Sequence, residues 1–278
     1  MDKKYNIGIV GLGYVGKAIH NVFSVNHNVF TNDIIQECTD NSLESLSVKS
    51  DIIFLCVPTP MKKDGSCSSD IVDDILKNLN NLNNTKEIVI KSTIPPGTCD
   101  FFQKKYSNLN IVFNPEFLTE ANFTDDFLKQ NRIILGGENI SKVKNLYKKD
   151  FPNTEIIHLS YKESEMVKYF SNAFLATKVS FANELFSLCK KMNINYETVV
   201  RTVIKDNRIG KSHFEVPGPD GNYGFGGSCF PKDLSALISV FKDNNVESVV
   251  LNSVWNRNNT IDRKEKDWEN LKGRAIEE

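Results

Sequence analysis

The sequence predicts an α/β fold, in which a doubly wound, mostly parallel sheet is followed by an all-helical domain. From Asn6 to about Ser160, short β-branched runs alternate with amphipathic stretches, which is typical of βαβ units with helices on both faces of a sheet. A glycine-rich turn directly follows the first of these runs. After Ser160 the alternation stops, and residues 163–192 place apolar residues at helical spacing without a glycine or proline. We therefore expect a sheet domain over residues 1–160 and a helical domain over residues 161–278.

The elements follow from these patterns in chain order. The strand-like runs are Ile7–Val10, Val29–Thr31, Asp51–Val57, Glu87–Lys91, Ile111–Phe113, Arg132–Leu135 and Glu155–His158. The helical candidates between them are Gly16–Val25, Ser69–Leu79, Cys99–Tyr106 and Ser141–Lys149. In the second domain we expect one long helix over 163–192, a second over Tyr196–Lys205, a loop rich in glycine and proline at 215–227, and then further helical segments.

The composition limits the class of protein. The chain has 278 residues, of which 40% are hydrophobic, and 34 Lys and Arg against 35 Asp and Glu leave a net charge of −1. The hydrophobic share excludes a disordered or fibrous chain. The even charge balance leaves no basic excess for binding nucleic acid. The N-terminal segment lacks the apolar block of a secretory signal, and no stretch approaches the roughly 18 apolar residues of a membrane span. We expect a soluble, cytoplasmic protein that binds neither nucleic acid nor a membrane.

The cysteines and histidines show no metal-binding pattern. The six cysteines include no CxxC pair, and the four histidines never fall three to five residues apart. We therefore expect no bound metal.

The turn after the first strand carries a fingerprint of dinucleotide binding. Its G-x-G-x-x-G pattern allows a tight turn, close approach of the backbone to a pyrophosphate, and close packing of the helix on the strand. Asp33, at the end of the second strand, is placed to accept hydrogen bonds from a ribose diol. Residues 32–36 contain no arginine for a 2′-phosphate, so the sequence favours NAD over NADP. The cofactor contacts expected here are Gly11, Leu12, Gly13, Tyr14, Val15, Gly16 and Asp33.

Two further turns, Val57–Pro60 and Lys91–Gly97, follow apolar strands and contain prolines. Prolines can simply punctuate loops. Ligands of open α/β sheets, however, lie at the carboxyl ends of the strands, where the glycine turn also lies. We therefore expect cofactor contacts from Pro58, Thr59, Pro60 and Ser92.

Two pairs of polar residues leave alternatives open. Glu116 and Glu120 lie four residues apart after a strand, and Lys168 and Asn172 lie four apart on one face of the long helix. Glutamates in such positions are often merely solvated, and an exposed lysine beside an asparagine is ordinary. On spacing alone, these residues are either surface residues or parts of a site.

The segment 224–233 holds a candidate nucleophile. Cys229 follows a glycine-rich loop and opens a helix, where the helix dipole lowers a thiol pKa, and Lys232 lies within one turn. A buried structural cysteine is the alternative, but such cysteines rarely follow three glycines beside a Lys-Asp pair. We therefore interpret Cys229 as a nucleophile.

Taken together, the motifs resemble the UDP-glucose/GDP-mannose dehydrogenase family. The matching stretches occur in family order from residue 7 to about 235, and they are GLGYVG, Asp33, KSTIPPGT, NPEFLTE, KYFSNAFLATKVSFANEL, NRIG and GFGGSCFPKD. The resemblance implies a Rossmann-type NAD-binding domain and a helical domain for substrate binding and dimerisation. It also implies a two-step, four-electron oxidation of a sugar alcohol to a carboxylate with NAD. Within the family, the motifs are most similar to those of enzymes that convert UDP-glucose to UDP-glucuronate.

The resemblance implies a role for each catalytic residue. Cys229 would attack the sugar aldehyde to give a thiohemiacetal, which loses a hydride to become a thioester. Lys168 and Asn172 would stabilise the oxyanions that form. The other implied roles are activation of water by Asp233, proton relay by Glu116 and the holding of a water by Thr93.

The resemblance also implies the binding contacts. Glu120 and Lys232 would lie near the nicotinamide half of the cofactor. In a homodimer built on the long helix, Arg208 would reach UDP-glucose from the neighbouring subunit, and the loop 214–227 would cover it. The implied substrate-binding residues are Phe117, Leu118, Arg208, Tyr223, Phe225, Gly226 and Gly227.

Two departures from the family pattern concern substrate binding. Family members usually continue into a second α/β domain that helps to hold the nucleotide, whereas this sequence ends at Glu278. The loop 215–223 is longer than usual. We therefore expect the substrate to be held by the central domain, the partner subunit or new contacts.

Three other functions stay open at this point. A sister enzyme that oxidises GDP-mannose or a UDP-N-acetylhexosamine would carry similar motifs. A β-hydroxyacid dehydrogenase shares the glycine turn and a Lys-x-x-x-Asn helix, but it needs no nucleophilic cysteine, so Cys229 argues against it. A non-catalytic protein that binds NAD or a sugar nucleotide is disfavoured by the joint presence of Cys229, Lys168, Asn172, Glu116 and Asp233.

Overall fold

The computed structural model describes residues 4–82 and 86–278 and divides into two compact units. The first unit runs to Thr59 and resumes over Ser68–Lys168, and the second comprises Pro60–Cys67 and Tyr169–Glu278. Residues 60–67, which the sequence pattern assigns to the sheet domain, thus group with the helical unit. They join it through backbone hydrogen bonds of Met61 with Ala275 and Glu277.

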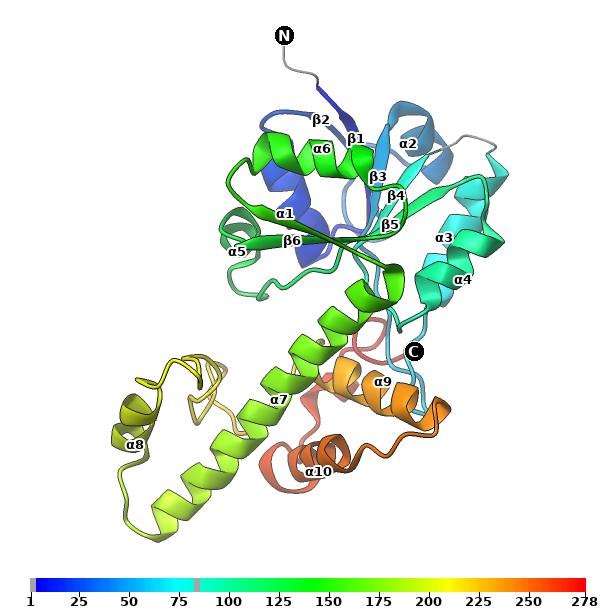
Figure 1. Cartoon of the computed structure of the whole chain (residues 1–278). Coiled ribbons are helices and arrows are strands. Elements are labelled where there is room, and N and C mark those ends of the chain that lie inside the picture. The colour runs from blue at the N-terminus through cyan, green and yellow to red at the C-terminus, as the bar shows by residue number, and fades with distance from the viewer. Residues whose placement is uncertain (1–3, 83–85) are drawn as a thin grey trace. The chain divides into compact units, whose positions relative to one another are not determined.

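The first unit is built on a seven-stranded sheet with the strand order β2-β1-β3-β4-β5-β6-β7 (Figure 1). The strands are β1 (Asn6–Val10), β2 (Asn28–Asn32), β3 (Ile52–Leu55), β4 (Glu87–Ile90), β5 (Asn110–Phe113), β6 (Arg132–Gly136) and β7 (Glu155–Leu159). All neighbouring strands run parallel except β5 and β6, which are antiparallel and pair at Phe113 and Gly136. The predicted α/β fold with a mostly parallel sheet is confirmed.

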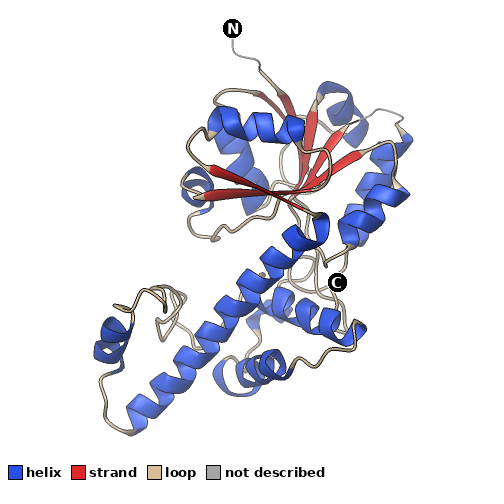
Figure 2. Cartoon of the chain, in the orientation of Figure 1, coloured by secondary structure: helices blue, strands red, loops and turns tan. Residues whose placement is uncertain are grey.

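Helices cover both faces of this sheet (Figure 2). They are α1 (Tyr14–Phe23), α2 (Leu43–Lys49), α3 (Asp70–Asn81), α4 (Thr98–Lys105), α5 (Phe123–Leu128) and α6 (Ser141–Asp150). Successive side chains of a strand point to opposite faces, so Phe54 packs in one core with α1, α5 and α6, while Ile53 packs in the other with α2, α3 and α4. The sequence pattern missed α2 and α5, whose 7 and 6 residues are too few to show a helical period.

The second unit is helical, as predicted. Its elements are the greater part of α7 (Tyr161–Lys191), α8 (Tyr196–Val203), α9 (Phe230–Asp243), α10 (Val249–Arg257), a π-helical turn (Asn258–Asp262) and a 3₁₀ turn (Asp267–Asn270). Its core includes Tyr169 and Ala173 of α7, Leu234 of α9 and Val254 of α10. No helix in the described part of the chain is long and apolar enough to cross a membrane.

Within the first unit, the start of α7 caps another helix. The buried carboxylate of Glu165 accepts hydrogen bonds from the backbone N–H groups of Gly97 (2.5 Å) and Cys99 (2.8 Å), at the N-terminus of α4. Burial raises the pKa of Glu165 to about 7, although these N–H groups act in the opposite direction. The turn 91–97 is therefore fastened to α7 by a carboxylate that titrates near neutral pH.

This cap predicts a pH-dependent stability. Because the pKa of Glu165 is higher in the folded chain than in an unfolded one, the folded chain binds the extra proton, and the free energy of unfolding falls as the pH rises from about 4.5 to about 7. The loss is on the order of 3 kcal/mol. Replacing Glu165→Gln removes this titration. As the pH rises from 4.5 to 8, the free energy of unfolding of the variant, measured by urea denaturation, should therefore increase by that amount relative to wild type. Glu163→Gln, at an exposed position nearby, should show no such gain, and a pH-independent effect of Glu165→Gln would contradict the assignment.

Candidate functional site

The glycine turn joins β1 to the N-terminus of α1. Gly11 has a φ of +93°, which favours glycine, and a Cβ there would lie 2.7 Å from Cys56 O. A Cβ on Gly16 would lie 1.9 Å from Gly11 O, so only glycine lets the helix pack on the turn. A Cβ on Gly13 would meet no atom within 4 Å. The backbone at Gly13 is therefore open to a pyrophosphate at the helix N-terminus.

Asp33 follows β2 directly and lies beside this turn. Its Oδ2 accepts a hydrogen bond from Leu12 N (2.6 Å), and its Oδ1 accepts from the N–H groups of Ile35 (2.7 Å) and Gln36 (2.9 Å). Burial would raise the pKa of Asp33, but these hydrogen bonds outweigh it and the pKa is lowered. The carboxylate is thus held ionised at the end of β2, with lone pairs left to accept from a ribose diol.

The two proline-containing turns of the first unit are bonded to each other. Thr59 Oγ1 donates to Thr93 O (2.7 Å), and Ser92 Oγ donates to Val57 O (2.7 Å). Thr93 and Ser92 are both buried. These contacts fix the carboxyl ends of β3 and β4 side by side, next to the end of β1.

The next strand end, after β5, carries a buried ion pair within the first unit. Lys168 Nζ lies 2.8 Å from Glu116 Oε1 and also donates to Glu116 O (2.6 Å), while Glu116 Oε2 accepts from Leu118 N (2.7 Å). The side chains of Lys168 and Glu116 are only 4% and 11% exposed. Burial would raise the pKa of Glu116, but Lys168, the Leu118 N–H and Lys91 together lower it. Lys168 and Glu116 are thus buried partners and not the solvated residues that spacing alone allowed.

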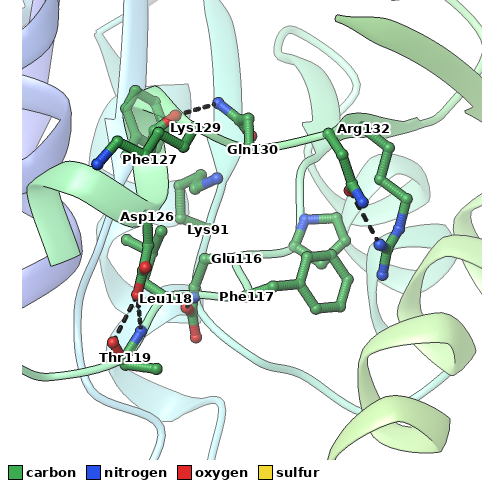
Figure 3. A pocket seen from close by; sticks show the side chains of 12 residues that line it. Lys91, Glu116, Phe117, Leu118, Thr119, Asp126, Phe127, Lys129, Gln130 and Arg132 are labelled. Atoms are coloured by element: carbon green, nitrogen blue, oxygen red, sulfur yellow. Dashed lines mark hydrogen bonds between the residues drawn. The ribbon is translucent and has the colours of Figure 1, made fainter. Parts of the chain in front are cut away.

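A cavity of about 360 Å³ opens beside this pair (Figure 3). Its lining includes Glu116, Phe117, Leu118, Phe127, Arg132 and Lys91. The centroid of the Phe117 ring lies 4.8 Å from the Arg132 guanidinium carbon and 5.4 Å from Lys168 Nζ. Sequence reasoning missed Arg132 and Lys91, because a cation at a strand end looks like a surface residue until the neighbouring strand ends are placed beside it.

In the second unit, Cys229 is the N-cap residue of α9, as the sequence pattern predicts for the start of this helix. Asp233, one turn into α9, accepts a hydrogen bond from Asn172 Nδ2 (2.6 Å) and pairs with Lys232. Lys232 and Asp233 are both buried. Burial would lower the pKa of Lys232, but the charge of Asp233, and that of the nearby Cys67 and Cys229 sulfurs when ionised, raise it. A thiol, an ammonium and a carboxylate therefore lie together at the start of α9.

The glycine-rich loop before α9 is fixed by residues near the end of the chain. Asn258 accepts from Phe225 N (2.9 Å) and donates to Phe225 O (2.9 Å), and Asp267 Oδ2 accepts from Gly227 N (3.2 Å). A Cβ on Gly226 would lie 2.4 Å from Arg263 Nη2. Sequence reasoning missed Asn258, Arg263 and Asp267, because no spacing links them to a loop more than thirty residues earlier.

Three other predicted residues, Glu120, Arg208 and Tyr223, have exposed positions. Arg208 is exposed and ion-paired with Asp206 (2.6 Å), and Glu120 is exposed. The ring of Tyr223 lies 5.9 Å from that of Phe186. Pro60 belongs to the second unit and not to the unit of the glycine turn. No group of three or more His, Cys, Asp or Glu in residues 4–82 and 86–278 is arranged to hold a metal ion.

The mostly parallel sheet, the glycine turn and the acidic residue after β2 are the features of an NAD-binding domain, and a helical domain follows it along the chain. Comparison with known proteins makes this specific: residues 32–150 match the NAD binding domain, and residues 162–260 the central domain, of the UDP-glucose/GDP-mannose dehydrogenase family. The chain belongs to this family.

Known relatives support the assignment. The chain is 38% identical over 213 residues to a UDP-glucose 6-dehydrogenase of Rickettsia prowazekii (strain Madrid E), which covers 73% of this chain and 48% of the relative. It is 33% identical over 296 residues to the putative UDP-glucose 6-dehydrogenase YtcA of Bacillus subtilis (strain 168), covering 91% and 67%. A solved UDP-glucose dehydrogenase of Pyrobaculum islandicum superposes with a TM-score of 0.81 at 28% identity, covering 92% and 68%. The chain spans about half the length of several of the curated relatives it matches.

The position of Asp33 predicts the choice of cofactor. A 2′-phosphate would meet the ionised Asp33 carboxylate, and no arginine lies in residues 32–36 to compensate. We expect NADP to bind at least about tenfold more weakly than NAD, a difference of about 1.4 kcal/mol, in isothermal titration calorimetry. Asp33→Asn keeps an acceptor for Leu12 N but removes the charge, so it should reduce the difference in affinity between NAD and NADP. Equal affinities of the wild-type protein for NAD and NADP would refute this role of Asp33.

Proposed function

We propose that this chain oxidises UDP-glucose to UDP-glucuronate in two NAD-dependent steps through a covalent intermediate on Cys229. The observation that carries the proposal is the thiol of Cys229 at the start of α9, beside the buried Lys232–Asp233 pair. Membership of the family supports the class of reaction, and the relatives named as UDP-glucose 6-dehydrogenases support the substrate. Because nucleotide sugars and NAD are metabolites of the cytoplasm, we propose that the protein acts there.

A nucleophile is needed because an aldehyde has no hydride to give until something adds to it. Cys229 Sγ would add to the aldehyde carbon formed in the first oxidation, and the resulting thiohemiacetal carries a hydride that can leave, which gives a thioester. Water then cleaves the C–S bond, releasing the carboxylate and the thiol. When bound, NAD accepts one hydride in each oxidation.

The buried polar groups suit the charges that arise in these steps. We assign to Lys168 the stabilisation of the alkoxide and of the tetrahedral oxyanions, because its ammonium is buried and held by Glu116. Asn172 would donate a hydrogen bond to the same oxygen. Asp233 would position the hydrolytic water, Glu116 would relay protons, and Thr93 would hold a water during the first oxidation.

The binding roles rest on the family resemblance and on exposure. Glu120 and Lys232 are proposed to contact the nicotinamide half of NAD. Phe117 and Leu118 line the cavity beside Glu116 and are proposed to contact the sugar. The loop residues Tyr223, Phe225, Gly226 and Gly227 are proposed to contact the nucleotide sugar.

We also propose that the active unit is a homodimer in which Arg208 acts on the partner's substrate. Along α7, the side chains of Phe170, Phe174 and Phe181 are 68%, 57% and 57% exposed. Pairing this face with its copy would remove that apolar surface from water. The exposed guanidinium of Arg208 suits a role in binding the pyrophosphate of a substrate held by the other subunit.

The nucleophile assignment predicts the outcome of replacing Cys229→Ser. A hydroxyl is far harder to ionise than a thiol at neutral pH, so uronate formation from UDP-glucose should fall at least about a thousandfold. NAD binding should persist, because the glycine turn lies in the other unit. Uronate is quantified by chromatography while NADH is followed by absorbance, with GDP-mannose and a UDP-N-acetylhexosamine as rival substrates. Cys189→Ser, near the end of α7, serves as the matched control and should retain activity. Undiminished formation of uronate by Cys229→Ser would show that the nucleophile is another residue.

The shared site predicts complementation between two inactive variants. Cys229→Ala and Arg208→Ala subunits are dissociated, mixed in equal amounts and reassociated. In a mixed dimer one site has both an intact Cys229 and an intact Arg208 from its partner, so roughly a quarter of wild-type activity should return. A mixture of Cys229→Ala and Lys168→Ala should stay inactive, because both residues act in their own subunit. Proven subunit exchange without recovery in the first mixture would place Arg208 in cis or outside the site.

A further inference from the structure

Lys91 is a buried lysine that the proposed reaction does not yet use. It follows β4 directly, is 3% exposed, and its ammonium donates to the neutral oxygen Asn114 Oδ1 at 3.0 Å. Asn114 is itself fixed, since its Oδ1 also accepts from Tyr147 Oη (2.6 Å) and its Nδ2 donates to Ile134 O (2.8 Å). Figure 3 shows Lys91 and Glu116 lining the same cavity. An ammonium in such a place must be stabilised by a nearby negative charge.

Several titratable groups from the packed elements face Lys91. They are Cys56 after β3, Glu116 after β5, Tyr147 of α6 through Asn114, and Lys168 of α7. Burial raises the pKa of Cys56 to about 12 and raises that of Tyr147, so both are neutral at physiological pH. Glu116, whose pKa is lowered, is therefore the anion among these groups.

We infer that Lys91 is a positioning residue that, together with Lys168, keeps the buried Glu116 carboxylate ionised at the end of β5. Its ammonium also ties the end of β4 to Asn114, two residues before Glu116, and so holds this segment in place. The kinetic consequence of this inference rests on the proposed function, in which Glu116 relays protons. The electrostatic effect of Lys91 on Glu116 does not depend on the proposed function, because both residues lie in the first unit.

The coupling between the two groups must be reciprocal. Burial lowers the pKa of Lys91 to about 8, although Glu116 and Cys56 act to raise it. Lys91 in turn contributes to lowering the pKa of Glu116. Loss of the Lys91 proton near pH 8 therefore changes the electrostatic field at the Glu116 carboxylate.

The first test follows the Glu116 carboxyl carbon by NMR in protein labelled with ¹³C-glutamate. The signal is assigned by its absence in Glu116→Gln. In wild type the chemical shift of Glu116 should show a second inflection near pH 8, as Lys91 loses its proton. A flat response between pH 7 and pH 9 would overturn the inference. The titration itself is made on the wild-type protein and requires no enzymatic activity.

The second test compares variants around the same cavity. Lys91→Met removes the charge at similar volume and should raise the pKa of Glu116. The control Lys129→Met removes an exposed cation that lines this cavity and pairs with Asp125, and it should leave that pKa unchanged. Tyr147→Phe removes the other donor to Asn114 without changing a charge. If Tyr147→Phe raises the pKa of Glu116 as much as Lys91→Met does, the effect runs through Asn114 and the electrostatic inference is wrong.

The kinetic readout separates this inference from the proposed function. The acid limb of the pH profile of kcat/KM for UDP-glucose should move to higher pH in Lys91→Met, because Glu116 then requires a higher pH to ionise. An unmoved limb alongside a raised Glu116 pKa would overturn the kinetic role of Lys91. If the wild-type protein oxidises no nucleotide sugar, the proposed function fails, whereas the NMR titration still decides whether Lys91 controls Glu116.

Discussion

The ion pair between Lys168 and Glu116 is the interaction on which the first unit's site depends. Two opposite charges are removed from water at the end of β5, which is stabilising only when the geometry is good and the remaining lone pairs are satisfied. Both conditions are met, since Lys168 Nζ also reaches Glu116 O and Glu116 Oε2 accepts from Leu118 N. Removing one partner would leave a buried charge unpaired, so the Lys168 ammonium can stay buried because this carboxylate lies beside it.

The second unit also contains a buried ion pair, formed by different residues. The Asp233 carboxylate is buried against Lys232 and receives a hydrogen bond from Asn172. Helix α7 contributes to each cluster, Lys168 to the first and Asn172, four residues later, to the second. Burying a charged or polar group costs free energy. In each unit this cost is offset because a partner of opposite charge, or a hydrogen-bonding partner, is fixed next to the buried group.

The glycine turn depends on a steric constraint and not on charge pairing. A side chain on Gly16 would overlap the carbonyl of Gly11, so the helix can start this close to β1 only with glycine at that position. The close start brings the N-terminal N–H groups of α1 and the ionised Asp33 to the same edge of the sheet. The close packing of α1 on β1 therefore follows from local geometry that a short motif can encode.

The sequence by itself determined the features that depend on local pattern. Alternation and periodicity predicted every strand of the sheet and the long helix α7, and the spacing of Gly11, Gly13 and Gly16 predicted the tight turn between β1 and α1. Only the tertiary structure decided which polar residues are partners. Lys91 looks like a surface residue at a strand end, and Asp267 lies 40 residues beyond the loop glycine whose N–H it accepts. The physical reason is that burial and partnership arise when distant segments meet: the charge state of Glu116 depends on Lys91 and Lys168, and neither is a neighbour in sequence.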